Sequence, residues 1–163
     1  MFRLGIIIAS DKGYAGDRKD ESGKYIIETF TRLGYEIADY KIVPDEKADI
    51  SKALLHQADQ LGVDLILTSG GTGLSPRDVT PEATLGVIDR QVQGIPEAIR
   101  HKSAEITPRA MLSRAVAGIR HRTLIINLPG SPKAVEESLE IIFPVLRHAL
   151  EILKGQAGEC ARQ

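Results

Sequence analysis

The residues that could do chemistry gather on one glycine-rich stretch in the first half of the chain. A short apolar run predicts a buried strand, and it ends in a turn that contains Gly70, Gly71 and Gly73. Glycines at such a turn let the backbone approach a ligand closely and direct N–H groups at it. The loop that follows carries Arg77 and Asp78, one charge of each sign. A ligand that bears phosphate and is accompanied by a metal ion would use both charges.

The glycine turn does not match the known phosphate-binding fingerprints. It lacks the Gly-Lys-Ser/Thr ending of a P-loop, and Pro76 stands where the third glycine of a dinucleotide-binding fingerprint would be. By itself the turn is more typical of an ordinary connection after a strand. The hydroxyl groups of Ser69, Thr72 and Ser75, together with the position at the end of a strand, favour a functional interpretation.

Two aspartates on different loops are candidate metal or proton-transfer groups. Asp78 comes just before the expected helix N-cap Thr80, where the positive end of a helix favours a carboxylate in any case. Asp45 follows Pro44 and could be only a turn residue. As a pair on adjacent loops, however, they form a candidate site for Mg²⁺, which takes carboxylate oxygens and bridges them to phosphates. Glu46 could share or take over that role.

The sequence contains no recognisable set for nucleophilic catalysis or zinc binding. The 4 histidines are scattered without zinc-ligand spacing, and no Ser-His-Asp or Cys-His arrangement can be placed. The single cysteine, Cys160, lies in a tail and is interpreted as an unremarkable thiol. The basic stretch from Arg100 to Lys102, followed by Arg109 and Arg114, is interpreted as a solvated face. It could alternatively approach an anionic ligand or a neighbouring subunit.

Strands and helices alternate along the chain, which predicts an α/β fold: a three-layer αβα sandwich with a mostly parallel sheet and an antiparallel edge. Strands are predicted at residues 2–9, 35–43, 65–68, 115–119 and 123–128, the last two forming a hairpin. A long polar loop is predicted at residues 10–20. Helices are predicted at residues 22–33, 50–61, 81–89, 95–103 and 132–153, with N-caps at Asp49, Thr80 and Ser131.

The loops that follow four of these strands form the expected site. They are residues 10–20, 44–47, 70–80 and 129–131. Because the carboxyl ends of parallel strands share one edge of the sheet, these loops are candidates for a single ligand site. The last of them ends in Ser131 and Pro132, a strong helix-start signal.

The composition indicates a single soluble domain. The chain has 163 residues, and the prediction is one domain at residues 1–154 with a flexible tail at 155–163. A net charge of −1 gives no bulk field for nucleic acid or a membrane, and an aromatic content of 4% argues against flavin or single-strand stacking. No apolar run is long enough to span a membrane. We therefore expect a cytoplasmic protein that binds neither nucleic acid nor membrane.

Three stretches together resemble the molybdopterin adenylyltransferase family of molybdenum cofactor biosynthesis, the stand-alone bacterial relatives of the N-terminal domain of gephyrin. They are residues 68–84, with the glycine turn and the Arg-Asp-Val-Thr-Pro-Glu segment, residues 113–120, and residues 127–132. The resemblance covers residues 4–153. The loops around Asp45 and around Asp20 also fit it.

That resemblance implies an activity, namely Mg²⁺-dependent adenylylation of molybdopterin by ATP with release of pyrophosphate, in a homotrimer that could hand its product to a molybdate-insertion protein. It implies that Asp78 and Asp45 are catalytic and hold the metal. Phosphate-binding residues of nucleotide and pterin would be Ser69, Gly70, Gly71, Thr72, Gly73, Asn127, Pro129, Gly130 and Ser131. The pterin side would be lined by Ser10, Asp20 and Ser22.

Two alternatives stay open at this point. One is a paralogue of the same family that binds molybdopterin but adenylylates it poorly, although the presence of both Asp45 and Asp78 favours the enzyme. The other is a non-catalytic binding or scaffold module.

Overall fold

The computed structural model describes residues 1–156; of the tail predicted at residues 155–163, the part from residue 157 onward, including Cys160, lies outside the described residues. Over residues 1–156 the strands form a six-stranded sheet with the order β2-β1-β3-β6-β5-β4. β1, β2, β3 and β6 pair in parallel, whereas β5 is antiparallel to both β4 and β6, which confirms the predicted sheet with its antiparallel edge. The strands are β1 (Arg3–Ala9), β2 (Glu36–Val43), β3 (Leu65–Ser69), β4 (Arg90–Gln91), β5 (Ala117–Arg120) and β6 (Thr123–Leu128).

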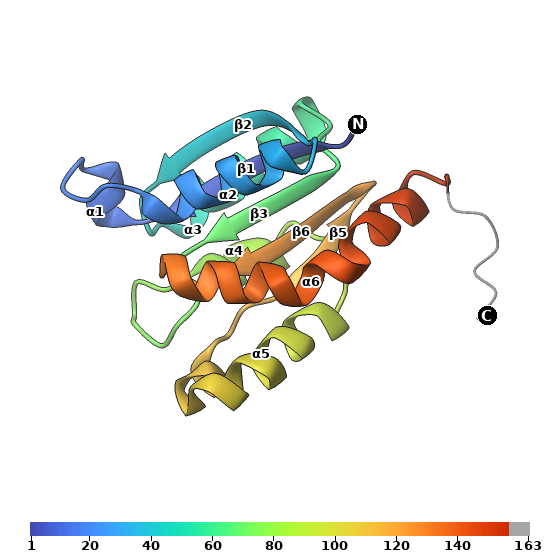
Figure 1. Cartoon of the computed structure of the whole chain (residues 1–163). Coiled ribbons are helices and arrows are strands. Elements are labelled where there is room, and N and C mark those ends of the chain that lie inside the picture. The colour runs from blue at the N-terminus through green and yellow to red at the C-terminus, as the bar shows by residue number, and fades with distance from the viewer. Residues whose placement is uncertain (157–163) are drawn as a thin grey trace.

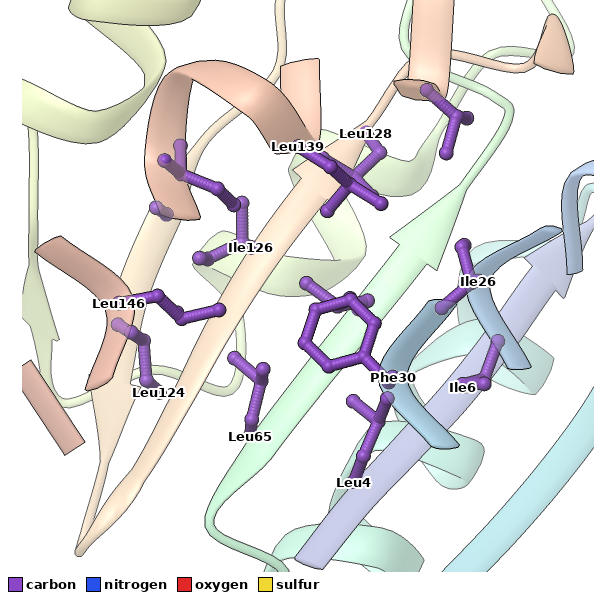
Figure 2. Packing of buried hydrophobic residues seen from close by; sticks show 14 of the residues in the cluster. Leu4, Ile6, Ile26, Phe30, Leu65, Leu124, Ile126, Leu128, Leu139 and Leu146 are labelled. Atoms are coloured by element: carbon purple, nitrogen blue, oxygen red, sulfur yellow. The ribbon is translucent and has the colours of Figure 1, made fainter. Parts of the chain in front are cut away.

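Helices cover both faces of the sheet and complete the three layers (Figure 1). On one face lie α2 (Glu21–Arg32), α5 (Gly94–Ile106) and α6 (Pro132–Leu153), and on the other lie α3 (Lys47–Leu55) and α4 (Thr80–Leu85). β3 and β6 are buried along their whole length, as expected for strands with helices on both faces. Phe30 of α2 belongs to the same core cluster as Leu4 of β1 and Leu65 of β3 (Figure 2).

Three predicted local features are wrong. Residues 10–20 are not an uninterrupted loop, because Ser10 Oγ accepts a hydrogen bond from Gly13 N and starts the short helix α1 (Asp11–Tyr14). Asp49 is not an N-cap, since α3 already begins at Lys47. Thr80 is not an N-cap either, since the cap is Val79 and the Thr80 hydroxyl donates to the carbonyl of Gly70.

The start of α6 agrees with the sequence. Ser131 is its N-cap, with Oγ accepting from Ala134 N, and Pro132 is its first residue. Gly34, which follows the C-cap Leu33 of α2, has a φ of +80°. No helix within residues 1–156 has the length and apolar character that a membrane crossing needs.

A β-bulge interrupts the pairing of β1 with β2. Leu4 pairs with Ile37 but Gly5 pairs with Asp39, so Ala38 is an extra residue on β2. The side chain of Gln57, from the π-helical turn η1 (His56–Gln60) after α3, fills this place. It donates to the carbonyl of Ile6 and to Asp39, and it occupies the space where Gly5 lacks a side chain.

The strand order fixes where a ligand can bind. After β1 the chain runs to β2 on one side, and β3 then lies on the other side of β1. In an open α/β sheet such a switch point leaves a crevice at the carboxyl ends of the two strands that separate there. The loops after β1 and β3 border this crevice.

Candidate active site

One cavity of about 710 Å³ lies at this switch point. That volume is in the range of small-molecule sites, roughly 300–1,000 Å³. It is lined by residues from the loops after all four parallel strands, so the predicted convergence of these loops on one edge is observed. The lining comprises Ile8, Ala9, Ser10, Gly13, Arg18, Lys19, Asp20, Glu21, Ser22, Asp45, Ser69, Gly70, Gly71, Asp78, Gly130, Ser131 and Pro132.

The glycine turn is held in a conformation that other residues rarely adopt. Gly70 and Gly71 have φ values of +93° and +66°. A Cβ on Gly70 would lie 2.4 Å from the carbonyl oxygen of Ala9, and a Cβ on Gly130, in the turn after β6, would lie 3.4 Å from the Cα of Gly70. Thr80 fixes the turn from behind, since its hydroxyl donates to Gly70 O at 2.9 Å and its N–H donates to Gly71 O at 3.1 Å.

Asp45 and Asp78 face the same cavity from neighbouring loops. Asp78 Oδ2 accepts from Ser75 N at 3.0 Å, which closes the loop after the glycine turn. Asp45 Oδ2 accepts from Asp11 N at 2.8 Å, and Oδ1 lies 3.3 Å from where a Cβ on Gly71 would stand. Burial raises the pKa of Asp45 above its ordinary value; the N–H of Asp11 opposes this rise, and the charges of Asp11 and Asp78 add to it. Two carboxylates that disfavour each other's charge are a suitable place for a cation.

This pair fits a magnesium ion that is shared with phosphates. Within residues 1–156 no group of three metal-binding side chains is present, so the protein alone forms no closed metal cage. Mg²⁺ in nucleotide sites is usually bound through only one or two carboxylates, with water and substrate phosphates completing its shell. The donor set of Asp45 and Asp78 is of this kind.

The residues predicted for the pterin side also line the cavity. Ser10 caps α1, Asp20 Oδ1 accepts from Gly23 N as the cap of α2, and the buried Ser22 donates to Gly130 O at 2.8 Å. Arg18 and Lys19, which the sequence analysis did not single out, lie beside them in the lining. The cavity lining therefore includes the acidic pair Asp45 and Asp78, and near the start of α2 it includes side chains of both charges.

Four predicted phosphate-binding residues lie elsewhere. They line a separate cavity of about 290 Å³ that also borders α5 and α6; they are Thr72, Gly73, Asn127 and Pro129. Asn127 is 1% exposed, and its Nδ2 donates to Thr68 and Thr84 while Oδ1 accepts from Val116 N. The amide of Asn127 thus joins β6 to β3, to α4 and to the segment before β5. These bonds hold in place the glycine turn after β3 and the turn at residues 129–131 after β6.

We expect Asn127→Ala to lower the free energy of unfolding by about 2 kcal/mol, because it leaves the hydroxyls of Thr68 and Thr84 and the N–H of Val116 without their buried partner. Chemical denaturation followed by circular dichroism measures the change. Ser138→Ala is the control, since Ser138 is equally buried but bonds only to the carbonyl of Ala134 one turn earlier. Equal losses in both variants would contradict the special role of Asn127.

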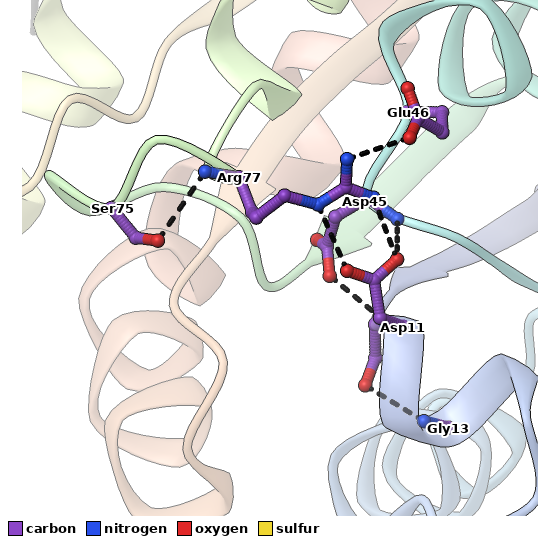
Figure 3. Close-up of polar contacts among 7 residues, drawn as sticks. Asp11, Gly13, Asp45, Glu46, Ser75 and Arg77 are labelled. Atoms are coloured by element: carbon purple, nitrogen blue, oxygen red, sulfur yellow. Dashed lines mark hydrogen bonds and ion pairs between the residues drawn. The ribbon is translucent and has the colours of Figure 1, made fainter.

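Three arginines are engaged near the site, and two of them, Arg100 and Arg114, were interpreted from the sequence as solvated. Arg77 pairs with Asp11 and Glu46, next to Asp45 of the cavity lining (Figure 3). Arg114 donates to Gly73 O at 2.7 Å and to Asp78 O at 2.6 Å, and its guanidinium also contacts Glu82. Arg100 donates to the carbonyls of Ser113 and Ala115, so it too is engaged within the protein.

Fold and cavity together define a doubly wound α/β protein with a polar ligand site at its switch point. Residues 5–148 match the model of the family described as a probable molybdopterin binding domain. The chain is 41% identical over 154 residues to the molybdopterin adenylyltransferase of Helicobacter pylori, covering 93% of this chain and 88% of the relative. It is also 41% identical to gephyrin of Dictyostelium discoideum. That match covers 94% of this chain but only 23% of the length of the gephyrin.

A solved structure is similar over the same range. The molybdopterin biosynthesis enzyme MoaB from Thermus thermophilus superposes with a TM-score of 0.90 at 54% identity, covering 95% of this chain and 98% of that one. The protein therefore belongs to the molybdopterin-binding family of molybdenum cofactor biosynthesis, which confirms the resemblance seen in the sequence.

Proposed function

We propose that this protein is a molybdopterin adenylyltransferase, which transfers the adenylyl group of ATP to molybdopterin. The observation that carries the proposal is the convergence of four strand-end loops on one polar cavity that contains both Asp45 and Asp78. The name borne by relatives of 41% identity over most of the chain supports it.

In the proposed reaction, an oxygen of the terminal phosphate of molybdopterin attacks the α-phosphorus of ATP. One P–O bond forms there, the bond from the α-phosphorus to the oxygen bridging to the β-phosphate breaks, and pyrophosphate leaves. A phosphate monoester is mostly ionised at neutral pH, so the protein needs no nucleophile of its own. Its task is to hold two anionic substrates in line and to stabilise the charge on the transferred group.

We assign the residues of the cavity to the two substrates. The turns around Gly70 and Gly130 would bind phosphates through backbone N–H groups and the hydroxyl of Ser131. The hydroxyl of Ser69 donates to Pro129 O at 2.8 Å, so we assign Ser69 to the connection between the two turns. On the pterin side, Arg18 and Lys19 supply positive charge next to the residues predicted there, Ser10, Asp20 and Ser22. Thr72, Gly73, Asn127 and Pro129 line the other cavity, so we assign them to support of the two turns.

Asp45 and Asp78 would hold Mg²⁺ together with the phosphates of ATP. When bound, the ion would neutralise phosphate charge and make the α-phosphorus more susceptible to attack. Asp45, whose pKa is raised mainly by burial, gains a partner for its negative charge in this arrangement. The homotrimer and the hand-over to a molybdate-insertion protein stay predictions from the resemblance, and the cytoplasmic location stays a prediction from the composition and the apolar pattern of the sequence.

The test is a direct transfer assay. Purified protein is mixed with molybdopterin, Mg²⁺ and ATP labelled at the α-phosphate, and the label is expected in adenylylated molybdopterin with equimolar pyrophosphate. The product should disappear when Mg²⁺ is removed with a chelator and return on its addition. Tight pterin binding without labelled product would contradict the proposal and favour a binding paralogue.

A further inference from the structure

Asp11, a residue that is not part of the proposed metal pair, holds Asp45 through two reciprocal hydrogen bonds. The N–H of Asp11 donates to Asp45 Oδ2 at 2.8 Å, and the N–H of Asp45 donates to Asp11 Oδ1 at 2.9 Å (Figure 3). The first bond fixes the carboxylate of Asp45, and the second fixes its backbone. Asp11 is the first residue of α1, so the loop after β1 determines where the carboxylate after β2 points.

The carboxylate of Asp11 is itself held by Arg77. Arg77 Nε donates to Asp11 Oδ2 at 3.1 Å and Nη2 to Oδ1 at 3.0 Å, while Nη1 donates to Glu46 Oε1 at 2.7 Å. A guanidinium bound by two parallel bonds has a fixed orientation as well as a fixed distance. Arg77 directly precedes Asp78, so one side chain connects the loops that carry Asp45 and Asp78.

We infer that Asp11 and Arg77 are positioning residues, which set the orientation of Asp45 and its separation from Asp78 for a shared divalent cation. This inference rests on the proposed function, because it assumes that the two aspartates share a metal. It extends that function to two residues that are not part of the cavity lining. Figure 3 shows the arrangement: Arg77 reaches from its own loop toward Asp11, with Asp45 and Glu46 around it.

A stabilising surface ion pair would not explain this arrangement equally well. The side chains of Arg77 and Asp11 are 51% and 45% exposed, and exposed pairs contribute only about 0–1 kcal/mol to stability. Residues that orient metal ligands, by contrast, typically change metal affinity about 10- to 100-fold when they are lost. The two interpretations therefore differ in which quantity a substitution changes.

Arg77→Ala distinguishes positioning from simple electrostatics by the sign of its effect. Removal of a positive charge beside a cation site would strengthen cation binding if only Coulomb interactions mattered. Loss of the hydrogen bonds by which Arg77 connects its loop to Asp11 and Glu46 would instead weaken cation binding. The same variant thus has opposite outcomes under the two explanations.

The experiment measures binding of Mn²⁺, a spectroscopic substitute for Mg²⁺, by electron paramagnetic resonance in the presence of ATP and without molybdopterin, so that no turnover occurs. We expect Arg77→Ala and Asp11→Ala each to raise the dissociation constant for Mn²⁺ about 10-fold or more. The double variant should lose no more affinity for Mn²⁺ than either single variant, because Asp11 and Arg77 act as one unit. Should Asp11→Ala fail to fold, Asp11→Asn takes its place, since it keeps an acceptor for the N–H of Asp45.

Arg147→Ala is the matched control. It also removes one positive charge and one exposed ion pair, with Glu151, but toward the C-terminal end of α6, whose N-terminus borders the cavity. We expect its Mn²⁺ affinity to equal that of the unaltered protein. Unaltered or tighter Mn²⁺ binding by Arg77→Ala, or additive losses in the double variant, would overturn the inference.

The failure of the proposed function would look different. Unaltered protein that binds Mn²⁺ with ATP, loses this binding on Asp45→Asn, and yet transfers no adenylyl group would disprove the activity while the positioning result stands. Mn²⁺ binding that is insensitive to Asp45→Asn would overturn the positioning role whatever the transfer assay gives.

Discussion

Asp78→Asn should reduce the rate of adenylyl transfer by about 10²- to 10³-fold, the size typical for loss of one preorganised group that stabilises transition-state charge. An asparagine keeps the shape of the side chain, and its Oδ1 can still accept from Ser75 N as the aspartate does. What it loses is the negative charge that a metal ion requires. Molybdopterin affinity should stay largely unchanged, because the cavity lining is spread over four loops.

The measurement is a single-turnover transfer assay combined with equilibrium binding of molybdopterin. Asp49→Asn serves as the control, because it makes the same chemical change outside the cavity. Asp49 is exposed and lies in the first turn of α3. Full activity of Asp78→Asn would remove Asp78 from the mechanism. Equal losses of pterin binding and transfer would assign it to the shape of the glycine loop instead.

Gly70→Ala should lower the free energy of unfolding by about 2–5 kcal/mol. A left-handed backbone costs a non-glycine residue about 1–2 kcal/mol, and forcing extra atoms into a packed region adds about 1–3 kcal/mol. At Gly70 both costs apply, because φ is +93° and the new Cβ would lie 2.4 Å from the carbonyl oxygen of Ala9. That atom belongs to the backbone of a central strand and cannot move aside cheaply.

Gly34→Ala separates the two costs. Gly34 has a similar φ of +80°, but nothing lies within 4 Å of its added Cβ. We therefore expect only the backbone cost, about 1–2 kcal/mol, in the same chemical denaturation experiment. If Gly70→Ala and Gly34→Ala lowered the free energy of unfolding equally, the close contact between the glycine turn and β1 would add no cost to the substitution at Gly70.

The architecture could be predicted because it depends on local patterns. Apolar runs placed the parallel strands within a few residues, and the Ser131-Pro132 signal located the start of α6. The convergence of the strand-end loops followed from the geometry of any parallel sheet. Thr80 was misassigned because its hydroxyl bonds across the turn to Gly70 rather than to its own helix, and sequence neighbours do not reveal such a choice.

The support of the site could not be predicted in the same way. Arg114 binds the carbonyls of Gly73 and Asp78, which lie 41 and 36 positions away along the chain, and no local pattern marks an arginine with such partners. Asn127 was assigned to phosphate binding from the family resemblance, but its amide donates to Thr68 of β3 and Thr84 of α4. Asp11 was missed although the sequence carried a signal, since a carboxylate two residues after the first strand lies at the edge where ligands bind.

The bulge at Ala38 has a consequence for how this family can vary in length. A bulge is a local insertion, because the pairs on both sides of the extra residue keep their partners. Deletion of Ala38 would therefore remove the bulge and leave the pairs from Gly5–Asp39 to Ala9–Val43 in register, so Asp45 would keep its place after the end of β2. A relative can accordingly be one residue shorter at this position and still carry the aspartate at the cavity.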